Sequence, residues 1–171
     1  MSDTQPDAID KLMADHDRVE AIFKKLKNAN EDETRTLGVQ VCNLVKIHMI
    51  LEEEFLYPAL RGKAEAKEDK LDEGLVEHDT GKLIINDVLS DPGNKTLGPK
   101  LQVFGEQMVH HHKEEEENHK GVFDMARHSD IDLVAMREDM DAREAELRKE
   151  LKEGDLPASE MNFVEAEATP N

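Results

Sequence analysis

The sequence lacks tryptophan, has a single cysteine and contains no long apolar run. Aromatic residues make up 4% of its 171 residues, so no platform for stacking nucleic-acid bases is evident. Cys42 has no second cysteine in the chain, which excludes an internal disulfide and a zinc site built from several thiolates. No apolar run approaches the roughly 18 residues that span a bilayer, and we expect no transmembrane segment.

Positive charge is also scarce. The chain has 22 lysine and arginine residues against 40 aspartate and glutamate residues, which gives a net charge of −18. Because this charge repels phosphate groups and anionic lipids, we expect neither nucleic acid nor a membrane as a partner. Residues 1–10 are acidic and polar and do not resemble a secretory signal. The composition therefore predicts a cytoplasmic protein with a charged surface.

The apolar residues fall on stripes that repeat every three or four positions, which is the period of an α-helix. These stripes predict helices over about 9–26, 33–60, 65–89 and 97–127, and a charged fifth helix over 130–153. Pro58 predicts a kink near the end of the second helix, and the polar residues 114–121 predict a bend in the fourth. Short connections favour an all-α fold, an up-down-up-down antiparallel four-helix bundle with an additional C-terminal helix.

The same pattern divides the chain into three parts. Residues 1–128 are expected to form the four-helix bundle, and residues 129–153 the additional C-terminal helix. Residues 154–171 contain Pro157 and Pro170 and few apolar side chains, so the sequence predicts a flexible tail there.

Each of the four long predicted helices carries a histidine on its apolar stripe. A single buried histidine is more often a hydrogen-bonded core residue than a metal ligand. Four helices with the same feature favour a shared metal, because a metal gives each otherwise unsatisfied imidazole a bond. On the fourth helix the stripe selects His111 from the run 110–112, with His112 as the main alternative. The four candidate ligands are His16, His48, His78 and His111.

Two of these histidines are followed, four residues later, by a glutamate on the same helix face. The pairs are His48 with Glu52 and His111 with Glu115, and the alternative register pairs His112 with Glu116. Two buried carboxylates repel each other unless cations lie between them. Four histidines and two carboxylates exceed the needs of one zinc ion and suit two iron or manganese ions with open positions. The remaining histidines, His110, His119 and His128, are expected at the surface or behind the ligands.

These residues resemble the hemerythrin-like family of HHE cation-binding domains. The matching stretches are residues 14–20, 46–60, 76–78 and 105–116, so the resemblance spans all four bundle helices, about residues 8–127. It implies a non-haem di-iron centre with an oxo or hydroxo bridge, for which manganese or zinc would be less suitable metals. His16 and His48 would bind one iron, His78 and His111 the other, and Glu52 and Glu115 would bridge the two.

The resemblance also implies that the protein binds O2 or a related small ligand for sensing, storage or stress response. Oxygen carriers of the family place a second histidine one turn after the ligand of the third helix, where this sequence has Lys82. That departure favours an alternative, a di-iron enzyme that consumes peroxide, O2 or nitric oxide. Lys82 is then a candidate proton donor, and Tyr57 is either a candidate redox group or a packing residue. No catalytic residue or organic cofactor site is assigned, and the sequence does not predict an oligomeric state.

Two further interpretations fit the residues less well. A ferritin-like oxidase would carry Glu-x-x-His pairs, whereas here each histidine precedes its glutamate. A purely structural protein would use the buried polar residues to set helix register and its acidic fifth helix to dock a partner.

Overall fold

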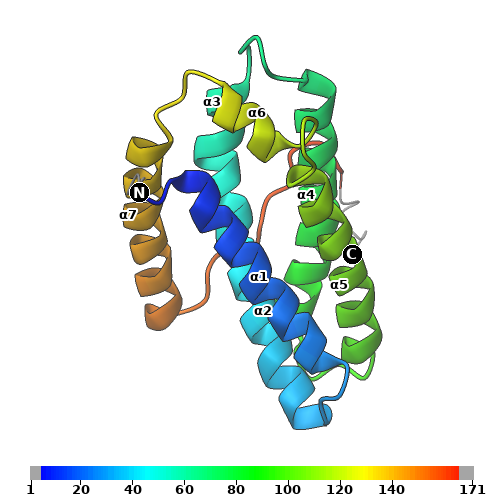
Figure 1. The fold of residues 1–171 in the computed structure, drawn as a ribbon. Coiled ribbons are helices and arrows are strands. Elements are labelled where there is room, and N and C mark those ends of the chain that lie inside the picture. The colour runs from blue at the N-terminus through cyan, green and yellow to red at the C-terminus, as the bar shows by residue number, and fades with distance from the viewer. Residues whose placement is uncertain (1–4, 166–171) are drawn as a thin grey trace.

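A computed structural model describes residues 5–165, which form α-helices joined by turns and contain no β-strand within that range (Figure 1). The prediction of an all-helical fold is therefore confirmed. None of the helices in this part of the chain is long and apolar enough to cross a membrane. The elements in order are α1 (Ala8–Leu26), α2 (Glu31–Leu51), η1 (Glu52–Leu56), α3 (Tyr57–Leu60), α4 (Glu68–Ser90), α5 (Leu97–Glu115), α6 (Val122–His128) and α7 (Leu133–Glu153).

Short polar motifs begin the first two helices. Asp7 accepts a hydrogen bond from the backbone N–H of Asp10, whose side chain accepts one from the N–H of Asp7 in return. Asn30 and Glu33 form the same reciprocal pair at the start of α2. Such capping boxes satisfy backbone donors that have no partner inside the helix, and each cap contributes about 1 kcal/mol.

The second predicted helix, over 33–60, is continuous through α2, η1 and α3, but its regular hydrogen bonding is interrupted. The N–H of Tyr57 donates to the carbonyl of Glu52, five residues earlier, which makes η1 a π-helical turn. Pro58 explains the position, because it has no N–H and its ring crowds the carbonyl of Glu54. The irregularity predicted near Pro58 thus takes the form of a π turn, which places both Glu52 and Tyr57 on the buried side of the segment.

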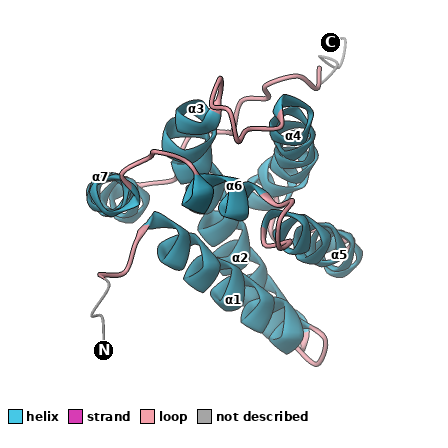
Figure 2. Ribbon diagram, turned by 45° about the horizontal axis from the view of Figure 1, so that its top comes forward, coloured by secondary structure: helices cyan, strands magenta, loops and turns pink. Residues whose placement is uncertain are grey.

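The fourth predicted helix, over 97–127, is instead two helices. α5 ends at Glu115, and residues 116–121 form a turn in which His119 has a positive φ of 64°. This stretch is polar and offers no apolar side chains to bury, so the chain leaves the bundle and re-enters it at Val122. α6 then lies across one end of the bundle, as Figure 2 shows.

The core contains two apolar clusters with a layer of buried polar residues between them. Along α1 the first cluster contributes Leu12, then comes His16, and then Val19 of the second cluster. Along α2 the order is reversed: Val45 of the second cluster comes first, then His48, and then Leu51 of the first cluster. α4 runs from Leu71 of the first cluster through His78 to Ile85 of the second, and α5 carries the second cluster up to His111, after which the first cluster resumes in α6. The apolar clusters therefore hold one polar layer at a common depth in four helices.

α7, the helix predicted over 130–153, packs against α1 and α2. Met136, Met140 and Leu147 are buried and belong to the first apolar cluster. The additional helix is thus part of the same core as the bundle.

The segment after α7, predicted to be flexible over 154–171, is described up to residue 165 and has no regular secondary structure there. It runs back along α2 and α4 (Figure 1). Leu156 is buried, and Lys46 of α2 donates to the carbonyl of Pro157. The buried carboxylate of Asp79 on α4 accepts the backbone N–H groups of Asn162, Phe163 and Val164. Residues 155–165 are therefore fixed to the bundle, and residues 166–171 lie outside the described part.

An ion pair between α1 and α7 predicts a dependence of stability on pH. Lys11 lies 3.0 Å from Asp141 and also donates to Glu144. Burial raises the pKa of Glu144, but its hydrogen bonds to Lys11 and Arg148 outweigh burial and lower the pKa below 4.5. Glu144 therefore stabilises the fold above its unfolded pKa, and this contribution disappears as pH falls through the lower folded pKa. We expect Glu144→Gln to lower the urea midpoint at pH 7.

The difference between wild type and Glu144→Gln should shrink as pH falls through the unfolded pKa of 4.5 and close below the lower folded pKa, as followed by circular dichroism. Glu146, which is 68% exposed, supplies the control Glu146→Gln, and this variant should match wild type at every pH. A difference for Glu144→Gln that does not shrink with falling pH would show that the carboxylate charge does not hold α7.

Candidate metal centre

The polar layer brings together the six residues predicted as metal ligands. Their potential ligand atoms form two overlapping groups, and within each group all atoms lie within 4.8 Å of one another. Both groups contain Glu52 and Glu115. The first adds His16 and His48, and the second adds His78 and His111. All six side chains are at most 3% exposed.

The histidines face the centre in two pairs through their Nε2 atoms. These atoms are 3.1 Å apart in the pair His16–His48 and 3.0 Å apart in the pair His78–His111. Glu52 Oε2 lies 3.3 Å from Nε2 of both His48 and His78. Glu115 Oε2 lies 3.3 Å from Nε2 of His16 and 3.5 Å from that of His111. Each glutamate therefore reaches one histidine from each pair.

The outer ring nitrogen of each histidine, Nδ1, faces a second carboxylate. The distances are 2.7 Å from His16 to Glu116, 2.9 Å from His78 to Glu53, 2.7 Å from His111 to Glu77 and 3.7 Å from His48 to Asp15. A proton on Nδ1 of His16, His78 or His111 can donate to these carboxylates, which leaves the lone pair of Nε2 directed inward. Metal-binding histidines are oriented in this way by outer carboxylates.

Whether a metal ion fits the centre can be judged from the hydrogen bonding of its buried carboxylate oxygens. Among residues 5–165, both oxygens of Glu52 and Oε2 of Glu115 have no hydrogen-bond partner. Buried carboxylate oxygens without partners are rare, because desolvating a charge costs several kcal/mol. Inward-facing imidazole nitrogens 3.0 Å apart also need a cation or proton between them. The donor set therefore fits metal ions.

The electrostatics of the centre favour positive charge. Burial lowers the pKa of His48, but the charge of Glu52 and the nearby carboxylate of Asp15 outweigh burial and raise the pKa to about 10. For His78, the neighbouring carboxylates of Glu52 and Glu53 likewise outweigh burial and raise the pKa to about 9. Burial raises the pKa of Glu52, yet the charge of His48 holds that pKa well below 4.5. The carboxylates thus stay ionised and attract cations.

Tyr57 takes part in the centre in a way that the helical pattern did not reveal. Its hydroxyl donates to Glu115 Oε1 over 2.8 Å, and its ring stacks on His78 with the ring centroids 5.4 Å apart. Burial and the charges of Glu115 and Glu52 raise its pKa well above 10, so the phenol keeps its proton. Pro58 was the only feature of the sequence that indicated this position of Tyr57, because the π turn before Pro58 directs Tyr57 inward.

Lys82, by contrast, lies behind the centre. Its Nζ is 2.8 Å from a carboxylate oxygen of Glu53, which is the outer partner of His78. Glu53 therefore stands between Lys82 and the ligand group, and Lys82 is not placed to donate a proton at the inward-facing atoms.

The alternative pair from the fourth helix is also close to the centre. Glu116 accepts from His16, and His112 is 1% exposed with its ring stacked on that of His16. Sequence reasoning treated His112 as an alternative to His111, whereas the structure buries both. His110, His119 and His128 are exposed, as expected.

The comparison with protein families agrees with this geometry. The model of the hemerythrin HHE cation-binding domain matches residues 7–123. The chain belongs to this family. The match includes all six predicted ligands, so the resemblance inferred from the motifs is confirmed, and the HHE domain is a cation-binding domain. A search of curated proteins and a search of solved structures gave no match.

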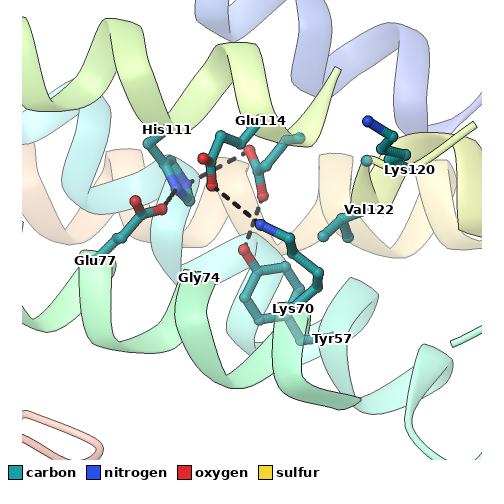
Figure 3. A pocket seen from close by; sticks show the side chains of 10 residues that line it. Tyr57, Lys70, Gly74, Glu77, His111, Glu114, Lys120 and Val122 are labelled. Carbon is teal, nitrogen blue, oxygen red and sulfur yellow. Dashed lines mark hydrogen bonds and ion pairs between the residues drawn. The ribbon is translucent and has the colours of Figure 1, made fainter. Parts of the chain in front are cut away.

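A small pocket lies beside one half of the centre of this HHE domain (Figure 3). Its volume is about 20 Å³, and Tyr57, His111 and Glu115 line it together with Gly74 and residues of the turn before α6. A cavity needs roughly 10–15 Å³ to hold one water molecule. The pocket therefore suits a ligand of a few atoms.

Gly74 predicts how sensitive the Tyr57 contact is to packing. A Cβ at Gly74 would lie 2.6 Å from the Tyr57 hydroxyl oxygen and 3.2 Å from the ring carbon that bears it. Gly74→Ala should push the hydroxyl away from Glu115 and lower the free energy of unfolding by about 1–3 kcal/mol, because a buried acceptor loses its donor. Thermal or urea unfolding measures the change.

Two variants control for helix propensity. A Cβ at Gly98 would meet no atom within 4 Å, so Gly98→Ala should be neutral or stabilise α5 by up to about 1 kcal/mol. In a Tyr57→Phe background the cost of Gly74→Ala should shrink. An equal cost in both backgrounds would mean that the hydroxyl is not what the alanine displaces.

Proposed function

We propose that this HHE domain holds two iron ions, one at His16 and His48 and the other at His78 and His111, with Glu52 and Glu115 reaching both. The observation that carries the proposal is that two four-residue groups share two buried glutamates, and that both oxygens of Glu52 and Oε2 of Glu115 lack hydrogen-bond partners among the described residues. Two ions between the glutamates would remove their repulsion and give each Nε2 a bond.

The donor types favour iron over other metals. Imidazole and carboxylate together suit iron, and manganese is the next candidate. A structural zinc site is closed by four ligands, whereas this centre offers six residues around two positions. We also propose an up-down-up-down antiparallel arrangement for α1, α2, α4 and α5, which the reversing order of the two apolar clusters along α1, α2 and α4 supports.

We further propose that the centre binds O2 or a related small ligand, for sensing, storage or stress response in the cytoplasm. Ferrous iron supplies a redox-active position for such a ligand. The pocket of about 20 Å³ beside His111 and Tyr57 limits the ligand to a few atoms. The chain itself positions the imidazoles through its outer carboxylates and offers the Tyr57 hydroxyl as a hydrogen-bond donor at the pocket. The net charge of −18 supports a protein without nucleic-acid or membrane partners.

Metal analysis tests this proposal with a control from the same helical turn. Wild-type protein loaded with Fe²⁺ without oxygen should retain two irons per chain after desalting, and admission of air should produce a near-ultraviolet absorption band. Glu52→Ala should lose iron and the band. Glu54→Ala should retain both, because Glu54 is 41% exposed and pairs with Arg143 outside the centre.

A chelator should lower the melting temperature of wild type and Glu54→Ala but not that of Glu52→Ala. Ligands present at about 100 times their dissociation constant stabilise a fold by about 2.7 kcal/mol per site. Wild type that binds no iron and melts at the same temperature with and without chelator would refute the proposal and favour a structural role for the polar layer.

The contact between Tyr57 and Glu115 favours a second candidate, an enzyme that consumes peroxide, O2 or nitric oxide. A phenol 2.8 Å from a ligand carboxylate can supply a proton or an electron at the pocket, which a protein that only binds a ligand does not require. Lys82, the donor considered from the sequence, is replaced in this role by Tyr57, because Glu53 separates Lys82 from the centre.

Peroxide turnover separates the two candidates. If the enzyme proposal is right, the iron-loaded protein should decompose hydrogen peroxide faster than free iron at equal concentration. Tyr57→Phe should then retain two irons and lose about 100-fold in rate, a usual contribution of a positioned proton donor. A wild-type rate no higher than that of Glu52→Ala would exclude an enzyme that consumes peroxide and leave the binding function in place.

A further inference from the structure

His112 is a buried histidine that the six-residue ligand set does not use. It lies at 1% exposure, and among residues 5–165 neither of its ring nitrogens has a hydrogen-bond partner. An imidazole buried without partners costs about 1–3 kcal/mol. Exposed histidines elsewhere on the chain, such as His110 and His128, carry no such cost. The position of His112 therefore needs a partner that the protein atoms do not supply.

The surroundings of His112 point to one half of the centre. One of its nitrogens lies within 4.8 Å of ligand atoms of both His16 and His48. Its ring stacks on that of His16 with the centroids 3.7 Å apart and the planes inclined by 7°. The ring of His48 meets it edge-on at 6.1 Å. No group of potential ligands in the described residues joins His112 to His78.

His112 also shares the orientation of the proposed ligands. Its Nδ1 lies 3.7 Å from a carboxylate oxygen of Glu20, the same distance that separates Nδ1 of His48 from Asp15. Every histidine of the centre has a carboxylate at Nδ1, and His112 repeats this pattern. With Nδ1 facing Glu20, Nε2 is the nitrogen that remains for a metal.

We propose that His112 is a fifth histidine ligand, bound to the metal ion held by His16 and His48. This inference rests on the proposed two-metal centre and makes that centre asymmetric. One ion has three imidazoles, and the ion at His78 and His111 has two. The open position then belongs to the second ion, on the side where the pocket and the Tyr57 hydroxyl lie. Oxygen carriers of the family have a histidine at the position of Lys82 on α4. Here His112 on α5 supplies an additional imidazole instead, and it supplies it to the other ion.

A stacking role alone is the competing explanation, and the variants are chosen to separate the two. Phenylalanine at position 112 can stack on His16 but cannot bind a metal. His112→Phe is therefore compared with His110→Phe, which alters an exposed neighbour on the same helix. Glu20→Gln leaves the imidazole in place and weakens only its outer partner.

The experiment uses the full chain with Co²⁺ in place of iron. Each histidine bound through Nε2 gives one exchangeable, strongly shifted N–H signal in the proton NMR spectrum of the paramagnetic protein. Wild type and His110→Phe should show five such signals, and His112→Phe should show four. His112→Phe should also release one of its two ions to a chelator at least about tenfold faster, while the other ion leaves at the wild-type rate.

Four shifted signals in wild type, unchanged in His112→Phe, would overturn the assignment of His112 and leave the two-metal centre intact. Two bound ions with no shifted imidazole signals, or no bound ion, would refute the centre itself. The wild-type count does not depend on any variant, so poor folding of His112→Phe would not prevent a decision. In that case Glu20→Gln should still show five signals.

Discussion

The charge of two buried carboxylates is the constraint on which the structure depends. Glu52 and Glu115 sit in the interior, and no donor in the described residues satisfies either oxygen of Glu52 or Oε2 of Glu115. Such groups are tolerated only near compensating positive charge. The surrounding polar residues can supply this charge: four imidazoles face the two carboxylates, and outer carboxylates orient the imidazoles. The apolar clusters on either side fix the depth of the layer.

Two local irregularities complete the centre. The π turn before Pro58 brings Tyr57 to the same buried side as Glu52, and the break after Glu115 turns α6 across the end of the bundle. Phe123 of α6 then stacks near the ring of His16 at 5.2 Å. Both irregularities cost regular helical hydrogen bonds. Each places a side chain where a straight helix would not, and π turns are frequent at functional sites for this reason.

Periodicity was sufficient to predict the long helices and to place His16, His48, His78 and His111 on buried faces. It could not predict features that depend on neighbours. His112 lies one residue beyond the apolar stripe and is buried because α1 and α6 cover that face of α5. Tyr57 required a π turn that has no periodic signature. The attachment of residues 162–164 to Asp79 is a long-range hydrogen-bonded contact between polar groups, which leaves no apolar pattern in the sequence.

The anchoring of the C-terminal segment has a consequence for the metal centre. Asp79, next to His78 in the chain, is buried, and three backbone N–H groups of that segment balance its charge. Its remaining cationic neighbour is Lys82, at 3.4 Å, which also pairs with Glu53 behind His78. If the segment were cut or displaced, Asp79 would compete with Glu53 for that single lysine. By holding Asp79, the C-terminal segment leaves Lys82 to pair with Glu53, the outer carboxylate of His78, and so supports the arrangement around that histidine.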